Sequence, residues 1–323
     1  MPANLTPQYY EAEKKYRSAR TPLEKMDALE EMMRVMPKHK GTDHLRADLR
    51  RRMAQVNDEM ESAAKKGHGF RIRREGAGQI VMAGLTNTGK SRLLRALTEA
   101  TPDVGSYPFV TLAVMPGMMR FENVQIQLID TPAINSRDAR VSVQGLLRTG
   151  DGILLVVDLG NDPVRQLDET LVILQEFKIV PGREAGVPEE GILGKPLLVV
   201  GNKSDLPHAA INYERLLARC CNLASVVSVS AETGAGLDEL RQQVFLMLNV
   251  IRVYTKPRSG KPDLSDPVLL QTGKTVQDFA MAVHKDFHAR MKYANIWGSG
   301  KFDGQRVSRD HQLQDGDIVE LHI

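Results

Sequence analysis

One short stretch, GLTNTGKS at residues 84–91, limits the possible folds of this chain more than any other. It fits the pattern G-x-x-x-x-G-K-[ST], it follows the apolar run QIVMA, and it precedes the helix-forming run SRLLRALTE. Gly84 and Gly89 let the backbone curl so that its amide groups can surround phosphates. The N-terminus of the following helix adds a favourable dipole. The stretch therefore predicts a phosphate-binding loop, with a plain glycine turn as the alternative.

Four other residues of this loop have expected roles. Lys90 would reach the β and γ phosphates of a nucleotide, and Ser91 would ligate Mg²⁺. Asn87 and Thr88 lie between the two glycines and are expected to bind the nucleotide with them. Because its charge would stabilise phosphate oxygens, Lys90 is also a candidate catalytic residue.

Apolar runs alternate with amphipathic helices from residue 78 to about 249. Several runs are almost continuously hydrophobic, which is typical of strands that are covered on both faces. The pattern predicts a doubly wound α/β domain. Its expected strands are 79–85, 118–124, 124–130, 152–159, 196–202 and 225–231, and its clearest helices are 164–177 and 237–249.

Two connections in this region are also predicted. The runs 118–124 and 124–130 adjoin, so we expect them to pair as a hairpin around Asn123. The segment IVPGREAGVPEEGILG lies between Lys178 and Lys195 and is rich in glycine and proline. It is therefore expected to be a surface loop.

The motif NKSD at residues 202–205 indicates which base the nucleotide carries. It follows a predicted strand, where ligands meet open α/β sheets. The Asp205 carboxylate can accept hydrogen bonds from N1–H and the 2-amino group of guanine, a pair of donors that adenine lacks. Asn202 is expected to contact the base edge, and the Lys203 stem to lie over its plane. A guanine nucleotide, GTP or GDP, is therefore the predicted ligand.

Two more segments follow predicted strands and complete the expected site. In SVSAETGAG (228–236), the amide of Ala231 is placed to bind the guanine carbonyl oxygen, with Ser230 shaping the turn. Asp130 ends the run VQIQLID, and we expect it to hold the Mg²⁺ shell through water.

The first 70 residues are predicted to be helical. In TPLEKMDALEEMMRVM, Thr21 can cap a helix, Pro22 suits its first position and Glu24 completes a capping box. A second apolar stripe follows Thr42, and the connector PKHKG joins the two. The segment therefore predicts an antiparallel helical hairpin whose stripes pack as a core. The stripe residues of the second helix are Leu45, Leu49, Met53, Val56 and Met60.

Residues 250–323 start a new pattern. IRVYTKP and PVLLQ are predicted strands, TVQDFAMAVHKDFHARM is one predicted helix, and YANIWGSG and DGDIVELHI supply later strands. This order predicts a small sheet with one helix packed across it. We therefore expect three domains: a helical arm at 1–75, a nucleotide-binding domain at 76–249 and a small α+β domain at 250–323.

The chain's net charge of +3 is unevenly distributed. Residues 1–75 carry 17 Lys and Arg against 12 Asp and Glu, a net +5 that could attract RNA phosphates. Because the same helices also carry many acids, a solvated helix face is the alternative. The candidate contacts are Lys38, Lys40, Arg46, Arg50, Arg51, Arg52, Arg71, Arg73 and Arg74.

Several features predict a cytoplasmic protein without a membrane span. No apolar run approaches the ~20 residues that a span needs. The start, MPANLTPQYYEAEKKYR, lacks the apolar stretch of a secretory signal. Cys220 and Cys221 are adjacent, so we expect them to be reduced thiols and not a structural disulfide.

Together the motifs resemble a known family. The ordered set GLTNTGKS, YPFVTL, DTPAI, NKSD and SVSA is similar to translation-factor-class GTPases, and more narrowly to the Obg family with its branch of developmentally regulated GTP-binding proteins. YPFVTLAVMPGMM (107–119) resembles that family's switch I region, which implies that Thr111 ligates Mg²⁺ and senses the γ-phosphate. The C-terminal strands resemble the TGS domain, a ubiquitin-like β-grasp module.

The resemblance implies both a fold and an activity. The fold is a Ras-like P-loop GTPase domain, doubly wound with a mostly parallel sheet, between a helical hairpin and a β-grasp domain. The activity is slow, Mg²⁺-dependent hydrolysis of GTP to GDP and phosphate by direct attack of water. Contact with the ribosome or RNA is implied for the N-terminal arm and the TGS domain.

Two features depart from the family pattern. Relatives in that branch carry a domain inserted between DxxG and NKxD, but here 72 positions separate Asp130 from Asn202, which indicates a shorter relative. Ala133 and Ile134 stand where DxxG has its glycine and where a catalytic glutamine often follows. Alanine keeps an amide for the γ-phosphate but restricts positive φ. A non-hydrolysing, GTP-dependent adaptor is therefore the alternative function, and a P-loop kinase would need an acceptor site.

Asn87 could compensate for the missing glutamine. The form G-x-x-N-x-G-K-S is similar to that of potassium-stimulated GTPases, in which this asparagine helps to hold a monovalent cation against the phosphates. Such a cation neutralises the charge that an arginine finger otherwise neutralises. We therefore expect Asn87 to bind K⁺ and to support catalysis, with simple stabilisation of the loop as the alternative.

Overall fold

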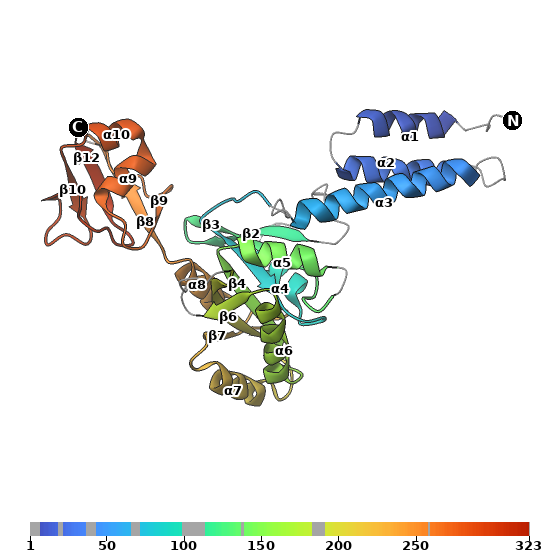
Figure 1. Ribbon diagram of the computed structural model, residues 1–323. Helices are drawn as coiled ribbons and strands as arrows, with labels where there is room; N and C mark the ends of the chain where they lie inside the picture. Colours follow the sequence, from blue (N-terminus) through green and yellow to red (C-terminus); the bar gives the residue numbers. More distant parts are fainter. Residues whose placement is uncertain are drawn as a thin grey trace. The chain divides into compact units, whose positions relative to one another are not determined.

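A computed structural model describes most of the chain, and its residues fall into two compact units, one ending at residue 72 and one beginning at residue 73. Figure 1 gives the elements of each unit. The described residues are 7–18, 22–36, 43–65, 72–98, 114–136, 139–182, 191–257 and 259–322.

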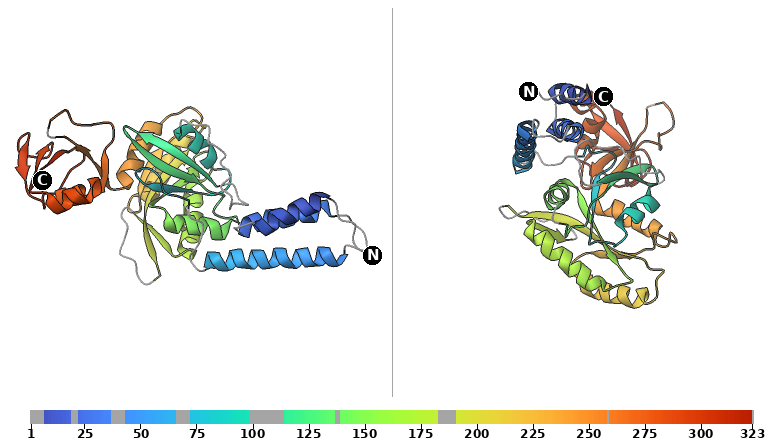
Figure 2. Two further views of the ribbon diagram at one scale, coloured as in Figure 1. Left: turned by 90° about the horizontal axis from the view of Figure 1, so that it is seen from above. Right: turned by 90° about the vertical axis from the view of Figure 1, so that its right-hand side faces the viewer.

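The first unit is a group of three helices: α1 (Pro7–Ser18), α2 (Pro22–Val35) and α3 (Asp43–Lys65). They lie side by side in Figures 1 and 2. The expected hairpin corresponds to α2 and α3, whereas α1 is an additional helix that packs against α2. The predicted cap Thr21 lies outside the described residues. On α3, Leu49 and Val56 of the expected stripe are buried and Leu45 and Met53 pack against the core, whereas the Met60 side chain lies outside the described residues. The buried residues of this core are Tyr9, Ala12, Leu29, Met32, Met36, Leu49 and Val56.

The second unit begins with a seven-stranded sheet in the order β2-β3-β1-β4-β6-β5, with β7 also paired to β6. Every pairing is parallel except that of β2 with β3, which form the predicted hairpin. The chain thus forms a doubly wound, mostly parallel sheet, as the sequence predicts. The strands are β1 (Gln79–Ala83), β2 (Met115–Phe121), β3 (Val124–Asp130), β4 (Gly152–Asp158), β5 (Ile179–Gly182), β6 (Leu193–Asn202) and β7 (Ser225–Ser228).

Both faces of this sheet are covered, because all seven residues of β4 are buried. Helices α4 and α8 share one core with the side chains of one face, as Leu94, Ile80 and Leu240 illustrate. The carboxyl ends of β1, β3, β4 and β6 meet at one edge, where the strand order reverses around β1 and where such sheets bind ligands. The helices are α4 (Lys90–Leu97), α5 (Arg140–Thr149), α6 (Pro163–Glu176), α7 (Ala209–Cys220) and α8 (Leu237–Met247).

The prediction of a surface loop between Lys178 and Lys195 is wrong in part. Residues 179–182 form β5, which pairs in parallel with residues 193–196 of β6. Proline and glycine suggested a turn here, but β5 is an edge strand, and an edge tolerates Pro181 because no further strand needs its missing N–H. Residues 183–190 lie outside the described part of the chain.

The C-terminal part forms a second, five-stranded sheet in the order β11-β10-β12-β8-β9. β8 pairs in parallel with β12 and the other pairings are antiparallel, as in a β-grasp fold. On β10 the buried Ala294 and Ile296 alternate with half-buried Tyr293 and Trp297, which therefore lie on the opposite face. The strands are β8 (Val250–Thr255), β9 (Val268–Gln271), β10 (Tyr293–Trp297), β11 (Gln305–Val307) and β12 (Ile318–His322).

The single helix predicted over 275–291 is wrong. The chain forms α9 (Val276–Val283) and α10 (Lys285–Arg290), separated by the extended residue His284. Its ring Nδ1 accepts a hydrogen bond from the Asp286 amide at 3.2 Å and so starts the second helix. Strand β11 was not predicted either.

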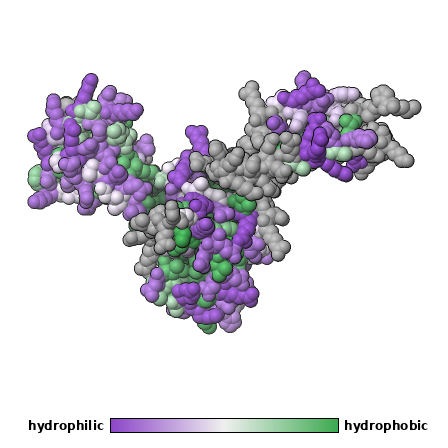
Figure 3. Space-filling model, viewed as in Figure 1, coloured by the Kyte–Doolittle hydropathy of each residue, from purple (hydrophilic) through white to green (hydrophobic). Residues whose placement is uncertain are grey.

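Among the described residues, no helix is both long enough and apolar enough to cross a bilayer. The face of the C-terminal β-grasp part that Figure 3 draws is mostly hydrophilic.

Candidate nucleotide-binding site

The predicted phosphate loop connects β1 to α4 and turns through left-handed conformations. Gly84, Asn87 and Gly89 have φ angles of +154°, +64° and +87°. A Cβ atom at Gly84 would lie 2.4 Å from the Val156 carbonyl oxygen, and one at Gly89 would lie 2.4 Å from Nδ2 of Asn202. Both glycines are therefore required by close approach as well as by φ.

Lys90 begins α4 and is 7% exposed. Its ammonium donates hydrogen bonds to the carbonyl oxygens of Gly84 (3.1 Å) and Leu85 (2.9 Å), which holds it across the loop. Burial lowers the pKa of Lys90, and the nearby Asp130 carboxylate opposes this shift. The loop thus presents a partly desolvated ammonium beside a helix N-terminus, an arrangement suited to phosphate.

Ser91 and Asp130, both predicted to hold Mg²⁺, are in contact. The Ser91 hydroxyl donates to Oδ2 of Asp130 at 2.5 Å. Oδ1 of Asp130 is buried and has no hydrogen-bond partner among the described residues. Burial raises the pKa of this carboxyl group, and the Ser91 hydrogen bond opposes the rise. A buried carboxylate oxygen beside a hydroxyl fits the oxygen ligands that Mg²⁺ prefers, whereas Thr111 lies outside the described residues.

The DTPAI segment runs directly beside the phosphate loop. The Thr131 hydroxyl donates to the carbonyl of Met82 at 2.7 Å, and the Ile134 amide donates to the carbonyl of Gly84 at 3.1 Å. Ala133 is not among the described residues with positive φ, so the conformational freedom of a glycine is not used there. Ile134 is 1% exposed, so its side chain belongs to the core and does not take the place of a water-orienting glutamine.

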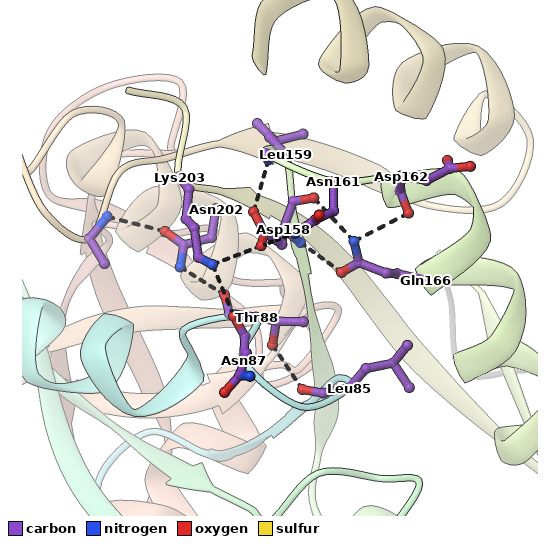
Figure 4. Close-up of polar contacts among 12 residues, drawn as sticks. Leu85, Asn87, Thr88, Asp158, Leu159, Asn161, Asp162, Gln166, Asn202 and Lys203 are labelled. Atoms are coloured by element: carbon purple, nitrogen blue, oxygen red, sulfur yellow. Dashed lines mark hydrogen bonds and ion pairs between the residues drawn. The ribbon is translucent and has the colours of Figure 1, made fainter. Parts of the chain in front are cut away.

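Asn202 joins three motifs that are far apart in the sequence. Its Nδ2 donates to the carbonyl of Thr88 at 2.9 Å, and its Oδ1 accepts from the Ala231 amide at 3.1 Å. The residue ends β6 and is 1% exposed (Figure 4). The sequence predicts that this carboxamide contacts the base edge and that the Ala231 amide binds the guanine oxygen, and both stay predictions. In the structure the two groups bond to each other and join the loops that meet at this end of the strands.

Asp205 and Ser230, two of the predicted nucleotide-binding residues, are in contact. The Ser230 hydroxyl donates to Oδ1 of Asp205 and accepts the amides of Glu232 (3.2 Å) and Thr233 (3.1 Å). Ser230 is 1% exposed, whereas Asp205 is exposed, so the buried hydroxyl orients a carboxylate that a base can reach.

One further contact was missed by the sequence reading. The Lys203 ammonium forms an ion pair with Oδ2 of Asp158 at 2.7 Å and donates to the carbonyl of Asn87 at 3.0 Å (Figure 4). Asp158 ends the apolar run of β4 in the same way that Asp130 ends β3. An acid that ends a buried strand at the ligand edge is a signal that could have identified it.

The exposed side chain of Asn87 is available at the same place. In the part of the chain that the structure describes, its carboxamide makes no hydrogen bond, while its backbone carbonyl accepts from Lys203. The amide oxygen is therefore free to act as a ligand.

Comparison with protein families agrees with this geometry. A family model described as "50S ribosome-binding GTPase" matches residues 79–184, which include the phosphate loop and the DTPAI segment. A second model, "TGS domain", matches residues 251–323, the five-stranded sheet with α9 and α10.

Comparison with individual proteins extends over most of the chain. It is 30% identical to the developmentally-regulated GTP-binding protein 2 homolog of Dictyostelium discoideum, over 93% of this chain and 98% of that protein. It is 29% identical to an uncharacterized GTP-binding protein of Methanocaldococcus jannaschii, over 93% and 92%. The YchF GTPase structure of Schizosaccharomyces pombe matches with a TM-score of 0.50 at 14% identity, over 79% of this chain and 100% of that one, which supports the fold alone.

Proposed function

This chain belongs to the family of developmentally regulated GTP-binding proteins, and we propose that it hydrolyses GTP to GDP and phosphate slowly, with Mg²⁺ and with stimulation by K⁺. The observation that carries the proposal is the contact between Ser91 and Asp130 beside Lys90, with one buried carboxylate oxygen unpartnered. These groups form a phosphate and metal site in a protein that has a P-loop GTPase domain.

The proposed roles at the phosphates follow from these contacts. Lys90 binds the β and γ phosphates through its buried ammonium. Ser91 ligates Mg²⁺, Asp130 holds the Mg²⁺ shell through water, and the family resemblance adds Thr111 as a further ligand. When bound, Mg²⁺ neutralises negative charge on the phosphate oxygens. Ile134 is buried, so no side chain at this position orients the attacking water, which is consistent with a slow intrinsic reaction.

The proposed roles at the base divide between direct and indirect contacts. Asp205 accepts the two guanine donors and the Lys203 stem covers the base. Asn202, Ser230 and Ala231 act through the hydrogen bonds that position these loops. Gly84, Thr88, Gly89 and Ala133 contribute backbone to the pocket.

Asn87 is the proposed K⁺ ligand, because its exposed carboxamide lies on the phosphate loop and makes no bond among the described residues. The matched test variant is Asn87→Gly, since glycine keeps the φ of +64° but removes the carboxamide. We expect the unaltered protein to release phosphate faster in K⁺ than in Na⁺, and the variant to release it equally in both salts.

The same assay separates the proposal from the alternative. Tight GTP binding without phosphate release in either salt would identify a non-hydrolysing adaptor. Equal turnover of the unaltered protein in K⁺ and Na⁺ would remove the K⁺ part and leave the GTPase. Affinity for ATP close to that for GTP would remove the guanine assignment.

We also propose that the protein binds the ribosome or RNA through its N-terminal helical arm (1–75) and its TGS domain (250–323), which precede and follow the GTPase domain (76–249) in the sequence. The support is the ribosome-binding description of the matched family and the basic sequence of the arm. On α3, Arg50 is exposed, but Arg51 and Arg52 both pair with Asp48 (3.0 and 2.8 Å). Co-sedimentation with ribosomes should therefore weaken with rising salt, and its absence at low salt would refute the partner. A cytoplasmic location stays a prediction.

A further inference from the structure

Asp158 is a buried carboxylate at the ligand edge that no nucleotide motif explains. It ends β4 and is 5% exposed. Its Oδ1 accepts the Gly160 amide at 2.8 Å, and its Oδ2 accepts Nδ2 of Asn161 at 2.7 Å and the Lys203 ammonium at 2.7 Å. A buried carboxylate that accepts from this many donors is held in one position.

The backbone of Asp158 is fixed separately by a side chain from α6. Oε1 of Gln166 accepts the Asp158 amide at 2.9 Å, and Nε2 of Gln166 donates to the Asp158 carbonyl at 3.2 Å. The side-chain amide thus binds both polar groups of one residue, much as a neighbouring strand would. Figure 4 shows Gln166 and Lys203 reaching Asp158 from different elements. The carboxylate is therefore preorganised before any ligand contacts it.

The ion pair continues from Asp158 into the phosphate loop. The same Lys203 ammonium donates to the Asn87 carbonyl at 3.0 Å, and Asn87 has a left-handed φ of +64°. Lys203 also has a left-handed φ, of +66°, at the start of the NKSD loop. The ammonium therefore links the NKSD loop to the phosphate loop at Asn87, and its ion pair with Asp158 holds it in place.

We propose that Asp158 is a positioning residue for GTP and GDP: it holds Lys203 so that the lysine stem covers the base while its ammonium fixes the Asn87 turn. The proposal rests on the proposed assignment of Lys203 to the nucleotide. A long, flexible lysine side chain loses much rotamer freedom when it is held in one place. Asp158 fixes it in advance, so its main effect falls on nucleotide release.

The test measures release of a fluorescent GDP analogue from the full-length protein. Asp158→Asn keeps the shape of the side chain but removes its charge, and we expect release to become roughly 10- to 100-fold faster, as for loss of a charge-assisted, buried pair. In Na⁺, where the proposed K⁺ site at Asn87 takes no part, the turnover number at saturating GTP should stay within about twofold of the original, because no group that contacts the phosphates changes. KM for GTP should rise.

The matched control is Asp151→Asn, just before the other end of β4. Asp151 pairs with Arg74 at 3.1 Å and accepts the Gln79 amide at 2.8 Å, so it is also a strand-end carboxylate in an ion pair. Asp151 lies just before the amino end of β4, whereas Asp158 lies at its carboxyl end. We expect this variant to release GDP at the original rate, and equal acceleration in both variants would overturn the proposal.

A double-mutant cycle separates positioning from a merely structural role. If Asp158 acts through Lys203, the double variant Asp158→Asn with Lys203→Met should release GDP no faster than Lys203→Met alone. If the increases in GDP release rate of the two single variants multiply in the double variant, Asp158 acts independently of Lys203, and the proposal is overturned. Unchanged release in Lys203→Met would refute the assignment of Lys203 itself. Acceleration in Lys203→Met without acceleration in Asp158→Asn would refute this inference alone.

A second variant keeps the test decisive if Asp158→Asn does not fold. Gln166→Met leaves the charge in place but removes both side-chain bonds to the Asp158 backbone. We expect a smaller acceleration of release, of roughly threefold to tenfold, as for loss of neutral hydrogen bonds. A release rate equal to that of the unaltered protein would overturn the proposal.

Discussion

Replacing Asn202 by alanine should lower both the free energy of unfolding of the protein and its affinity for nucleotide. The change deletes a carboxamide that is 1% exposed and leaves the Thr88 carbonyl and the Ala231 amide without partners. An unsatisfied buried polar group costs about 1–3 kcal/mol, so the two together cost about 2–6 kcal/mol. Because water can enter the space left by the side chain, we expect the lower end, about 2 kcal/mol. That is a large share of a typical stability of about 5–15 kcal/mol.

The measurement is urea unfolding with and without GDP. GDP binds the folded protein and should raise the midpoint of the unaltered chain, but this shift should shrink strongly in Asn202→Ala, because the loops that the carboxamide joins would separate. The matched control is Gln127→Ala, which also deletes a carboxamide that is 1% exposed. Gln127 bonds to Gln79 (2.8 Å) and to the Arg73 carbonyl (3.1 Å), away from the phosphate loop.

The two variants should therefore lose similar stability but differ in nucleotide binding. A stability of Asn202→Ala within about 0.5 kcal/mol of the original, with a normal GDP shift, would refute the reasoning. An equal loss of the GDP shift in Gln127→Ala would show that general loosening, and not the missing bridge, weakens the pocket.

Three further predictions follow from individual contacts. Burial raises the pKa of Asp130, so its contribution to stability is present at acidic pH and is lost as pH rises through the raised value. In urea unfolding at pH 7, Asp130→Asn should therefore have a larger free energy of unfolding than the unaltered protein, and it should lose less of that free energy between pH 4 and 7. By calorimetry, the variant should bind Mg²⁺ with GDP roughly 10- to 100-fold more weakly. Burial raises the pKa of Cys220 to about 11, so iodoacetamide at pH 8.5 should label exposed Cys221 first, as mass spectrometry would show; equal labelling of the folded protein would contradict this. Thr275→Ala removes the capping box that Thr275 forms with Asp278 and should cost about 1 kcal/mol in thermal unfolding, whereas an unchanged transition would show that the box adds nothing.

The central sheet could be predicted from sequence because its strands are buried on both faces. The run VQIQLID was predicted at 124–130, and β3 spans those residues. Strand β5 could not be found, because it is four residues long and owes its place to pairing with β6. The break at His284 was equally hidden, since an apolar periodicity continues across it and the capping bond to Asp286 is a local choice of one side chain.

The candidate site could be located from sequence, but its internal bonds could not. The motifs identify residues whose backbone or side chains suit a nucleotide. The structure places the two expected Mg²⁺ residues, Ser91 and Asp130, side by side, and it also places Ser230 beside Asp205. The motifs do not indicate which of their polar groups form hydrogen bonds with each other. The Asn202 carboxamide forms hydrogen bonds to two loops, because three strand ends converge there and the buried backbone groups of the loops need partners.

The bridge at Asn202 joins segments of this chain that lie far apart in the sequence, so it does not depend on the length of the connections between them. The alignment to the Dictyostelium relative runs over 363 residues while it takes in 93% of this 323-residue chain, so that relative has tens of positions without a counterpart here. The bridged segments meet because β1, β6 and β7 end at one edge of the sheet, whatever number of residues connects them. Insertions between the motifs therefore leave the bridge in place, whereas one extra residue between Gly84 and Thr88 would move the Thr88 carbonyl away from the carboxamide.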